Sequence, residues 1–265
     1  MTLTIALWCL SGGVVAGLLA GLLGIGGGLV VVPLLIYLLP IIGVEPQLVV
    51  PTAIATSLAT ICMTTASAAI SHSRTGLMAR FWLLRVLPGL SVGALMGAYL
   101  VTVVSPDSLR IIFAVVLVLL SIRMMLPAPQ GEPRTTVSKR LLAIGATLIG
   151  TISGLVGIGG GALTVPFLQR VRLPVHQAIA ISSLGSFVIG CSSVVMFIAI
   201  GWLSEDNGSS NALGLIHLPA WLAISITSVL MAPVGAKLAH KLPVKLLRRF
   251  FAAFLIVVAA NLLTQ

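Results

Sequence analysis

The sequence contains little charge and few aromatic side chains. Only 8% of its 265 residues are charged and 5% are aromatic, whereas 58% are hydrophobic. A soluble globular domain has about 25% charged residues, so this chain has too few polar side chains to cover its surface. Lipid must cover the remainder, and the composition excludes an ordinary soluble protein.

Acidic residues are scarcer than basic ones, with five Asp and Glu against 15 Lys and Arg. All five acids lie in loops between apolar runs: Glu45, Asp107, Glu132, Glu205 and Asp206. The apolar runs therefore contain no carboxylate for a proton relay or a cation site. The basic residues lie in short loops, as orientation in a membrane requires, and we expect no nucleic-acid partner.

Motifs for catalysis or metal binding are missing from the sequence. It has no HExxH motif, no GxSxG motif and no Walker GxxxxGK[ST] motif. Its three cysteines, Cys9, Cys62 and Cys191, form no CxxC pair and read as small buried hydrophobic residues. We expect no enzymatic activity, no cofactor and no bound metal.

Long apolar runs fill most of the chain. About 20 apolar residues are needed for a helix to cross a bilayer, and eight runs reach or approach that length: 5–23, 46–71, 82–104, 108–126, 141–156, 174–202, 215–236 and 246–263. Two shorter stretches, 29–39 and 162–168, each follow the same five residues, GIGGG.

This glycine block is an internal repeat. Gly24 to Gly28 is followed by Pro33, and Gly157 to Gly161 is followed by Pro166, at an offset of 133 residues. We therefore predict a first transmembrane repeat at 1–126, a polar linker at 127–139 and a second repeat at 140–265.

Loop charge predicts opposite orientations for the two repeats. With basic loops on the cytoplasmic side, each half has three crossings and one segment that returns to its own side. We predict an all-α polytopic membrane protein of two inverted repeats, each with three spanning helices plus one glycine-broken helical hairpin or re-entrant segment, giving about eight membrane segments. Secondary transporters share this architecture. The expected location is the cell membrane, most simply a bacterial inner membrane, with both termini outside.

The glycine blocks are candidate anion sites. Four glycines in five residues disfavour continuous helix, and irregular backbone survives in a bilayer only where it is buried in protein or lines a cavity. The free N–H groups at the start of each following half-helix would attract an anion. The candidate residues are Gly24, Gly26, Gly27, Gly28, Gly157, Gly159, Gly160 and Gly161. The alternative is close helix packing through small residues.

Hydroxyl side chains add to this candidate site. Thr56, Ser57, Ser182 and Ser183 lie at a repeated Ala-Ile-Ala position in the 46–71 and 174–202 helices. They could replace the water around an oxyanion, or they could simply bond to backbone carbonyls within their own helices.

The doubled GxGGG block with its following Pro, the paired hydroxyl helices and the chain length resemble the TauE/SafE family of sulfite exporter-like permeases. The resemblance covers essentially the whole chain. It implies transport of small sulfur-containing anions, such as sulfite or organosulfonates, as substrates. The residues leave open another cargo, such as a carboxylate or a metal, and a non-transporting membrane scaffold. A homo-oligomer is also left open.

Overall fold

Helices make up nearly all of the described chain. The computed structural model describes residues 3–23, 26–74, 80–126, 138–171, 173–203, 212–239 and 244–264. Within these ranges the elements are α1 (Leu3–Leu23), α2 (Gly28–Ile41), α3 (Pro46–Arg74), α4 (Arg80–Val103), α5 (Pro106–Met125), α6 (Lys139–Val156), α7 (Gly161–Arg170), α8 (Val175–Leu203), β1 (Ala212–Leu213), β2 (Ile216–His217), α9 (Leu218–Ala239) and α10 (Val244–Thr264).

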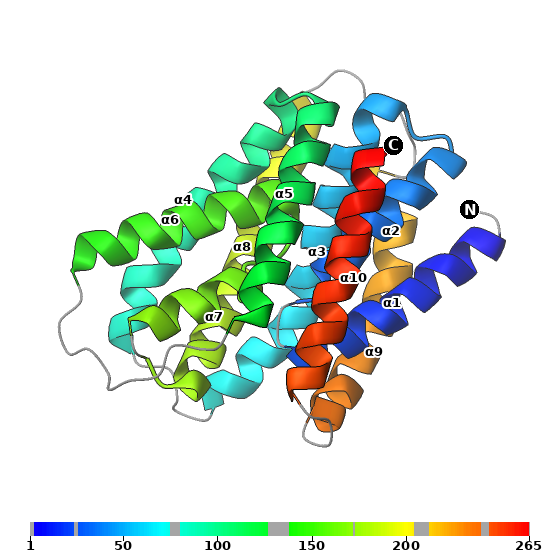
Figure 1. Cartoon of the computed structure of the whole chain (residues 1–265). Coiled ribbons are helices and arrows are strands. Elements are labelled where there is room, and N and C mark those ends of the chain that lie inside the picture. Colours follow the sequence, from blue (N-terminus) through cyan, green and yellow to red (C-terminus); the bar gives the residue numbers. More distant parts are fainter. Residues whose placement is uncertain are drawn as a thin grey trace.

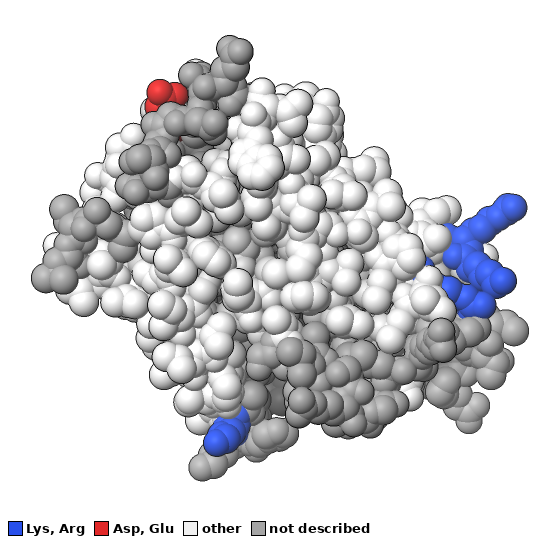
Figure 2. Space-filling model, turned by 180° about the vertical axis from the view of Figure 1, so that it is seen from behind, with Lys and Arg blue, Asp and Glu red and all other residues white. Residues whose placement is uncertain are grey.

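Seven helices in the described ranges are long and apolar enough to cross a membrane. They are α1, α3, α4, α5, α6, α8 and α9. Among the described residues on one face of the molecule, the Lys, Arg and acidic side chains lie near the edges and the middle is uncharged (Figure 2). The chain is an all-α polytopic membrane protein, as the sequence predicts.

Helix α3 forms the centre of the bundle. About 83% of its apolar span is buried, against 28–39% for each of the other six spans. It packs against α8, α2 and α9, and the Sγ atoms of Cys62 on α3 and Cys191 on α8 lie 3.1 Å apart. Because protein rather than lipid surrounds α3, its side chains are well placed to form an internal site.

The contacts between helices follow a two-fold pattern. Helix α1 packs on α9, and the equivalent helices α6 and α4 pack on each other in the same way. Helix α3 packs on its own equivalent, α8, and α5 packs on α10. In Figure 1, α5 and α10 stand side by side at the front, with α1 and α6 on opposite flanks. Exchanging the halves of the chain reproduces this set of pairs.

Glycines allow the helices of the equivalent pairs to pack with their backbones in close contact. A Cβ on Gly97 of α4 would lie 2.2 Å from the carbonyl oxygen of Thr151 on α6. A Cβ on Gly235 of α9 would lie 2.2 Å from the carbonyl oxygen of Leu18 on α1. Backbones that approach this closely leave room for no side chain, so these glycines pack helices rather than bind a ligand.

Two local features differ from the sequence expectation. The apolar run predicted from 215 begins instead with a two-stranded hairpin, in which Leu213 pairs with Ile216, and α9 starts at Leu218. The two short apolar stretches are separate helices, α2 and α7, each beginning just after a glycine block. The predicted linker lies mostly outside the described residues, so the domain division stays a prediction.

Candidate functional site

The first glycine block breaks the helical path between α1 and α2. Gly26 and Gly27 have φ angles of +83° and +72°, a left-handed conformation that glycine adopts without a Cβ penalty. Gly27 caps α2, and its carbonyl oxygen accepts the amide hydrogens of Val30 and Val31 at 3.0 and 3.3 Å. Helix α2 therefore starts inside the protein. Gly24 lies outside the described residues.

The second glycine block has the same geometry. Gly157 ends α6 with a φ of +76°, and Gly159 and Gly160 have φ angles of +54° and +74°. Gly160 caps α7, and its carbonyl oxygen accepts the amide hydrogens of Leu163 and Thr164 at 3.1 and 2.8 Å. The glycines thus permit a left-handed turn that starts each half-helix at a buried position.

The two breaks touch each other. A Cβ on Gly28 would lie 2.3 Å from the carbonyl oxygen of Gly157. The buried side chain of Ile61 on α3 lies beside both breaks, because Cβ atoms on Gly28 and Gly159 would lie 2.6 Å from its Cδ1 and Cγ2 atoms. In this conformation the side chain of Ile61 therefore lies against both breaks, where the anion site is predicted.

Two predicted hydroxyls bond to the glycine blocks. The Ser57 hydroxyl donates to the carbonyl oxygen of Gly157 at 3.0 Å, and the Ser182 hydroxyl donates to that of Gly161 at 3.4 Å. These serines occupy equivalent places on α3 and α8. Each therefore holds a block at the centre of the bundle, and Ser57 joins the two halves.

The other two predicted hydroxyls are engaged elsewhere. Thr56 Oγ1 accepts the amide hydrogen of His217 at 3.1 Å, which ties the hairpin before α9 to α3. The Ser183 hydroxyl donates to the carbonyl of Ile179, four residues earlier in the same helix, at 3.0 Å. In this conformation neither hydroxyl is directed at a glycine block.

Sequence reasoning missed two hydroxyls at the second break. Ser153 and Thr164 are 0% and 1% exposed, and their hydroxyl oxygens have no hydrogen-bond partner among the described protein atoms. Both flank Gly160, since a Cβ there would lie 3.3 Å from Ser153 Oγ and 3.6 Å from Thr164 Oγ1. A residue-by-residue comparison of the repeats could have found them, because Ala20 and Val31 occupy the equivalent positions.

The electrostatics around the breaks favour negative charge. The start of a helix carries a partial positive charge, and α2 and α7 both start here. Of the described acids, Glu45 lies between α2 and α3, and Asp107 lies in the first turn of α5 rather than in a loop. The described residues contain no group of three or more His, Cys, Asp or Glu side chains that could hold a metal.

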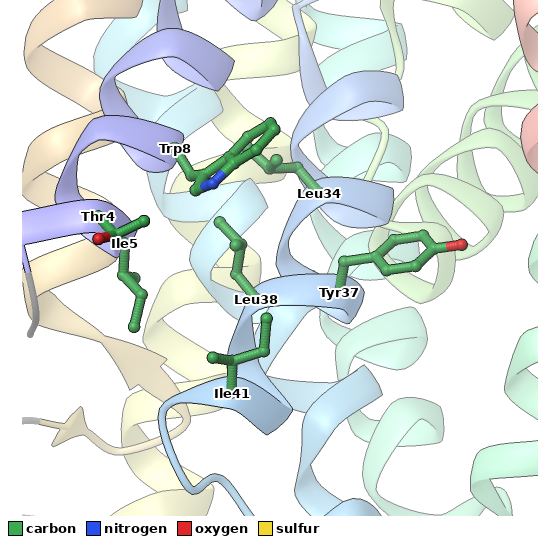
Figure 3. A pocket seen from close by; sticks show the side chains of 7 residues that line it. All are labelled: Thr4, Ile5, Trp8, Leu34, Tyr37, Leu38 and Ile41. Carbon is green, nitrogen blue, oxygen red and sulfur yellow. The ribbon is translucent and has the colours of Figure 1, made fainter.

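A separate hollow of about 510 Å³ lies between α1 and α2 (Figure 3). Its walls are almost entirely apolar, and the ring of Trp8 lies over Leu34. The Tyr37 hydroxyl points away from the hollow and hydrogen-bonds to Asn261 on α10. With half-exposed Trp8 and Tyr37 at its edge, this hollow suits hydrocarbon and is not part of the glycine site.

The sequence profile of the sulfite exporter TauE/SafE family matches residues 9–262. The chain belongs to the TauE/SafE family. Both glycine blocks and every described spanning helix fall within or overlap the matched range.

Several relatives of this TauE/SafE chain are described as probable membrane transporters. A “probable membrane transporter protein” of Haemophilus influenzae is 39% identical over 261 residues, which cover 98% of both chains. One from Bacillus subtilis is 30% identical over 202 residues, covering 69% of this chain and 73% of the relative. One from Methanocaldococcus jannaschii is 26% identical and covers 92% and 90%. No solved structure matches the chain significantly. The family and these relatives support a membrane transporter.

Proposed function

We propose that this TauE/SafE chain is a secondary transporter that moves small anions, sulfite or organosulfonates among them, through the region of the two glycine blocks. The observation that carries the proposal is that two half-helices start at buried positions, Gly28 and Gly161, and that the first start lies against the second glycine block at Gly157. Both present backbone amide groups and a positive dipole end to one region. An anion gains from that arrangement and a cation does not.

The sulfur-containing cargo is supported by the name of the family, which describes sulfite exporters. Sulfite and sulfonates offer several oxygen acceptors, which suit backbone amides and serine hydroxyls. Export would also match the membrane potential, because one negative charge moving out of an inside-negative cell gains about 2.3 kcal/mol per 100 mV.

Because Ile61 and the contact between Gly28 and Gly157 close the space, an anion can enter only after the helices move. We propose that the inverted halves move relative to each other and open the site to one side at a time, as in other repeat-built transporters. The conformation described is then the closed one.

The test is anion flux through the purified protein in liposomes. Vesicles loaded with sulfite should release it faster with the protein than without, and methanesulfonate should compete better than acetate. Gly26→Ala should slow the flux, because it places a side chain at a φ of +83° in the first block.

Gly43→Ala is the matched control. Gly43 also has a φ of +83°, but a Cβ there would meet nothing within 4 Å, and the residue lies in the turn between α2 and α3. It carries the same backbone strain away from the site. Lost flux with Gly26→Ala alone, at equal protein yield, supports transport through the blocks. Equal losses in both variants, or no flux with the unaltered protein, contradict the proposal.

A further inference from the structure

The second glycine block is flanked by two hydroxyls that the fold does not use. Ser153 lies one turn before the end of α6, where its carbonyl oxygen accepts the amides of Gly157 and Ile158 at 2.9 and 3.2 Å. Thr164 lies one turn inside α7, where its amide bonds to the carbonyl oxygen of Gly160 at 2.8 Å. The backbone therefore fixes both residues on either side of the break.

Burial without a partner is costly for these side chains. Leaving a buried hydroxyl unpaired costs about 1–3 kcal/mol, and a serine or threonine within a helix usually avoids this by bonding to the carbonyl four residues earlier. Ser153 and Thr164 do not make that bond, although each is at least 99% buried. Their shared position beside Gly160 indicates that both hydroxyls serve something that binds there.

The first glycine block lacks this pair. At the same offset of 133 residues the equivalents are Ala20 and Val31, which are buried and apolar. A Cβ on Gly27, the equivalent of Gly160, would lie near the backbone oxygen and Cβ of Ala16, with no hydroxyl among its nearest atoms. The two breaks share a backbone shape but differ in chemistry.

We propose that Ser153 and Thr164 form an oxyanion subsite with the amide groups at the start of α7, so that the cargo is held mainly by the second half of the protein. The inference rests on the proposed function, because it takes an anion as cargo. Hydroxyls can donate to an anion's oxygen atoms, and the start of α7 adds positive potential. The same potential repels a cation, and the two hydroxyls are too few to compensate for it.

The side chain of Ile189 on α8 packs against Gly160, since a Cβ there would lie 2.4 Å from its Cδ1 atom, so it would form an apolar wall beside the two hydroxyls. The cargo thus meets two hydroxyls and one apolar wall. Sulfite and sulfonates combine an oxygen-rich side with a weakly hydrated sulfur or carbon side, and they fit this pairing.

The experiment compares Ser153→Ala, Thr164→Val and the double variant with the unaltered protein in liposomes. Each single substitution should raise the KM for sulfite about tenfold, as expected for one lost hydrogen bond to a charged group. The melting temperature without sulfite should stay equal or rise, because an unpaired buried hydroxyl is removed. The rise in melting temperature that sulfite causes in the unaltered protein should shrink.

Ser225→Ala is the control. Ser225 on α9 is also buried, at 6% exposed, and its hydroxyl also has no partner among the described atoms, but it is not among the nearest atoms of either glycine block. Its KM should not change.

Three results would overturn the subsite: an unchanged sulfite KM in the double variant, a fall in melting temperature that shows a purely structural role, or stabilisation by Na⁺ rather than sulfite that the double variant loses. If the unaltered protein moves no anion, the proposed function fails. If it moves sulfite and the double variant does so with the same KM, only the subsite fails.

Discussion

Glycines determine the backbone geometry of the central region, and their clustering makes most of that geometry predictable from the sequence. The clustering of glycine in two blocks predicts the helix breaks, and the structure places left-handed residues in both. The sequence could not show that Ile61 would lie between them, because an isoleucine in an apolar helix carries no positional signal. Nor could it separate Thr56 from Ser57, because the partner of Thr56 comes from the hairpin before α9 and the partner of Ser57 comes from the second glycine block.

Gly28→Ala should destabilise the protein by about 1–3 kcal/mol, the usual cost of forcing extra volume into a packed core. The new Cβ would lie 2.3 Å from the carbonyl oxygen of Gly157, and neither backbone can yield easily. The measurement is the melting temperature in detergent.

Gly185→Ala is the comparison for Gly28→Ala, because its Cβ would meet only the terminal methyl of Leu90, at 2.7 Å. That side chain can rotate away, and alanine favours helix over glycine by about 1 kcal/mol. Gly185→Ala should therefore cost little. Equal losses of stability in the two variants would show that the breaks do not touch.

His217 should make stability depend on pH. Burial lowers the pKa of its imidazole below its ordinary value. The lowered pKa agrees with the geometry, since Nδ1 accepts the amide hydrogen of Ala220 at 3.3 Å and a proton there would break this bond at the positive end of α9. The unfolded chain then binds a proton more readily than the folded one, so stability is full at high pH.

As the pH falls through the unfolded value of about 6.5, that stability should be lost, and the loss should level off below the folded pKa. Melting temperatures from pH 8 to pH 5 test this. His217→Asn keeps a good helix cap but does not titrate, so its slope should be shallower. Identical slopes for the variant and the unaltered protein would exclude His217 as the cause.

At the scale of elements, the length of the apolar runs predicted the presence of the helices well and the residues at which they begin less well. Each of the eight long runs contains a helix, because about 20 apolar residues without a break have few alternatives in a bilayer. The hairpin before α9 was missed, because Leu213, Leu215 and Ile216 are as apolar as the helix that follows. Its turn at Gly214, with a φ of +60°, is the one signal that the run does not start as helix.

The pairing of α3 with α8 can be tested through cysteines that the chain already has. The Sγ atoms of Cys62 and Cys191 lie 3.1 Å apart, so oxidation catalysed by copper phenanthroline should join them without moving either helix. Denatured protein should then show one maleimide-reactive thiol, from Cys9, instead of three. Cys191→Ala should retain two reactive thiols after the same treatment.

At the scale of the whole molecule, the repeat was visible in the sequence, and the structure adds which pairs it makes. The contact of Gly97 with Thr151 and that of Gly235 with Leu18 are equivalents from opposite halves. A repeat offset in a sequence cannot show which helix of one half packs on which helix of the other, because that depends on how the two copies meet.

The loop charges predict that the two halves are inverted, and they predict which loops face outwards. In a variant without native cysteines, Glu45→Cys should react with a membrane-impermeant maleimide in intact cells, whereas Ser138→Cys should react only after the cells are opened. Both residues are exposed in the protein, so access decides the result. Labelling of both positions in intact cells would contradict the predicted topology.

The position of Ile61 limits how the molecule can work. Since this one side chain touches both glycine blocks, α3 cannot slide or turn without changing the surroundings of Gly28 and Gly159 together. Each glycine block is thereby linked to the other through a single branched residue, so in the proposed transport any opening beside one block should be coupled to the surroundings of the other.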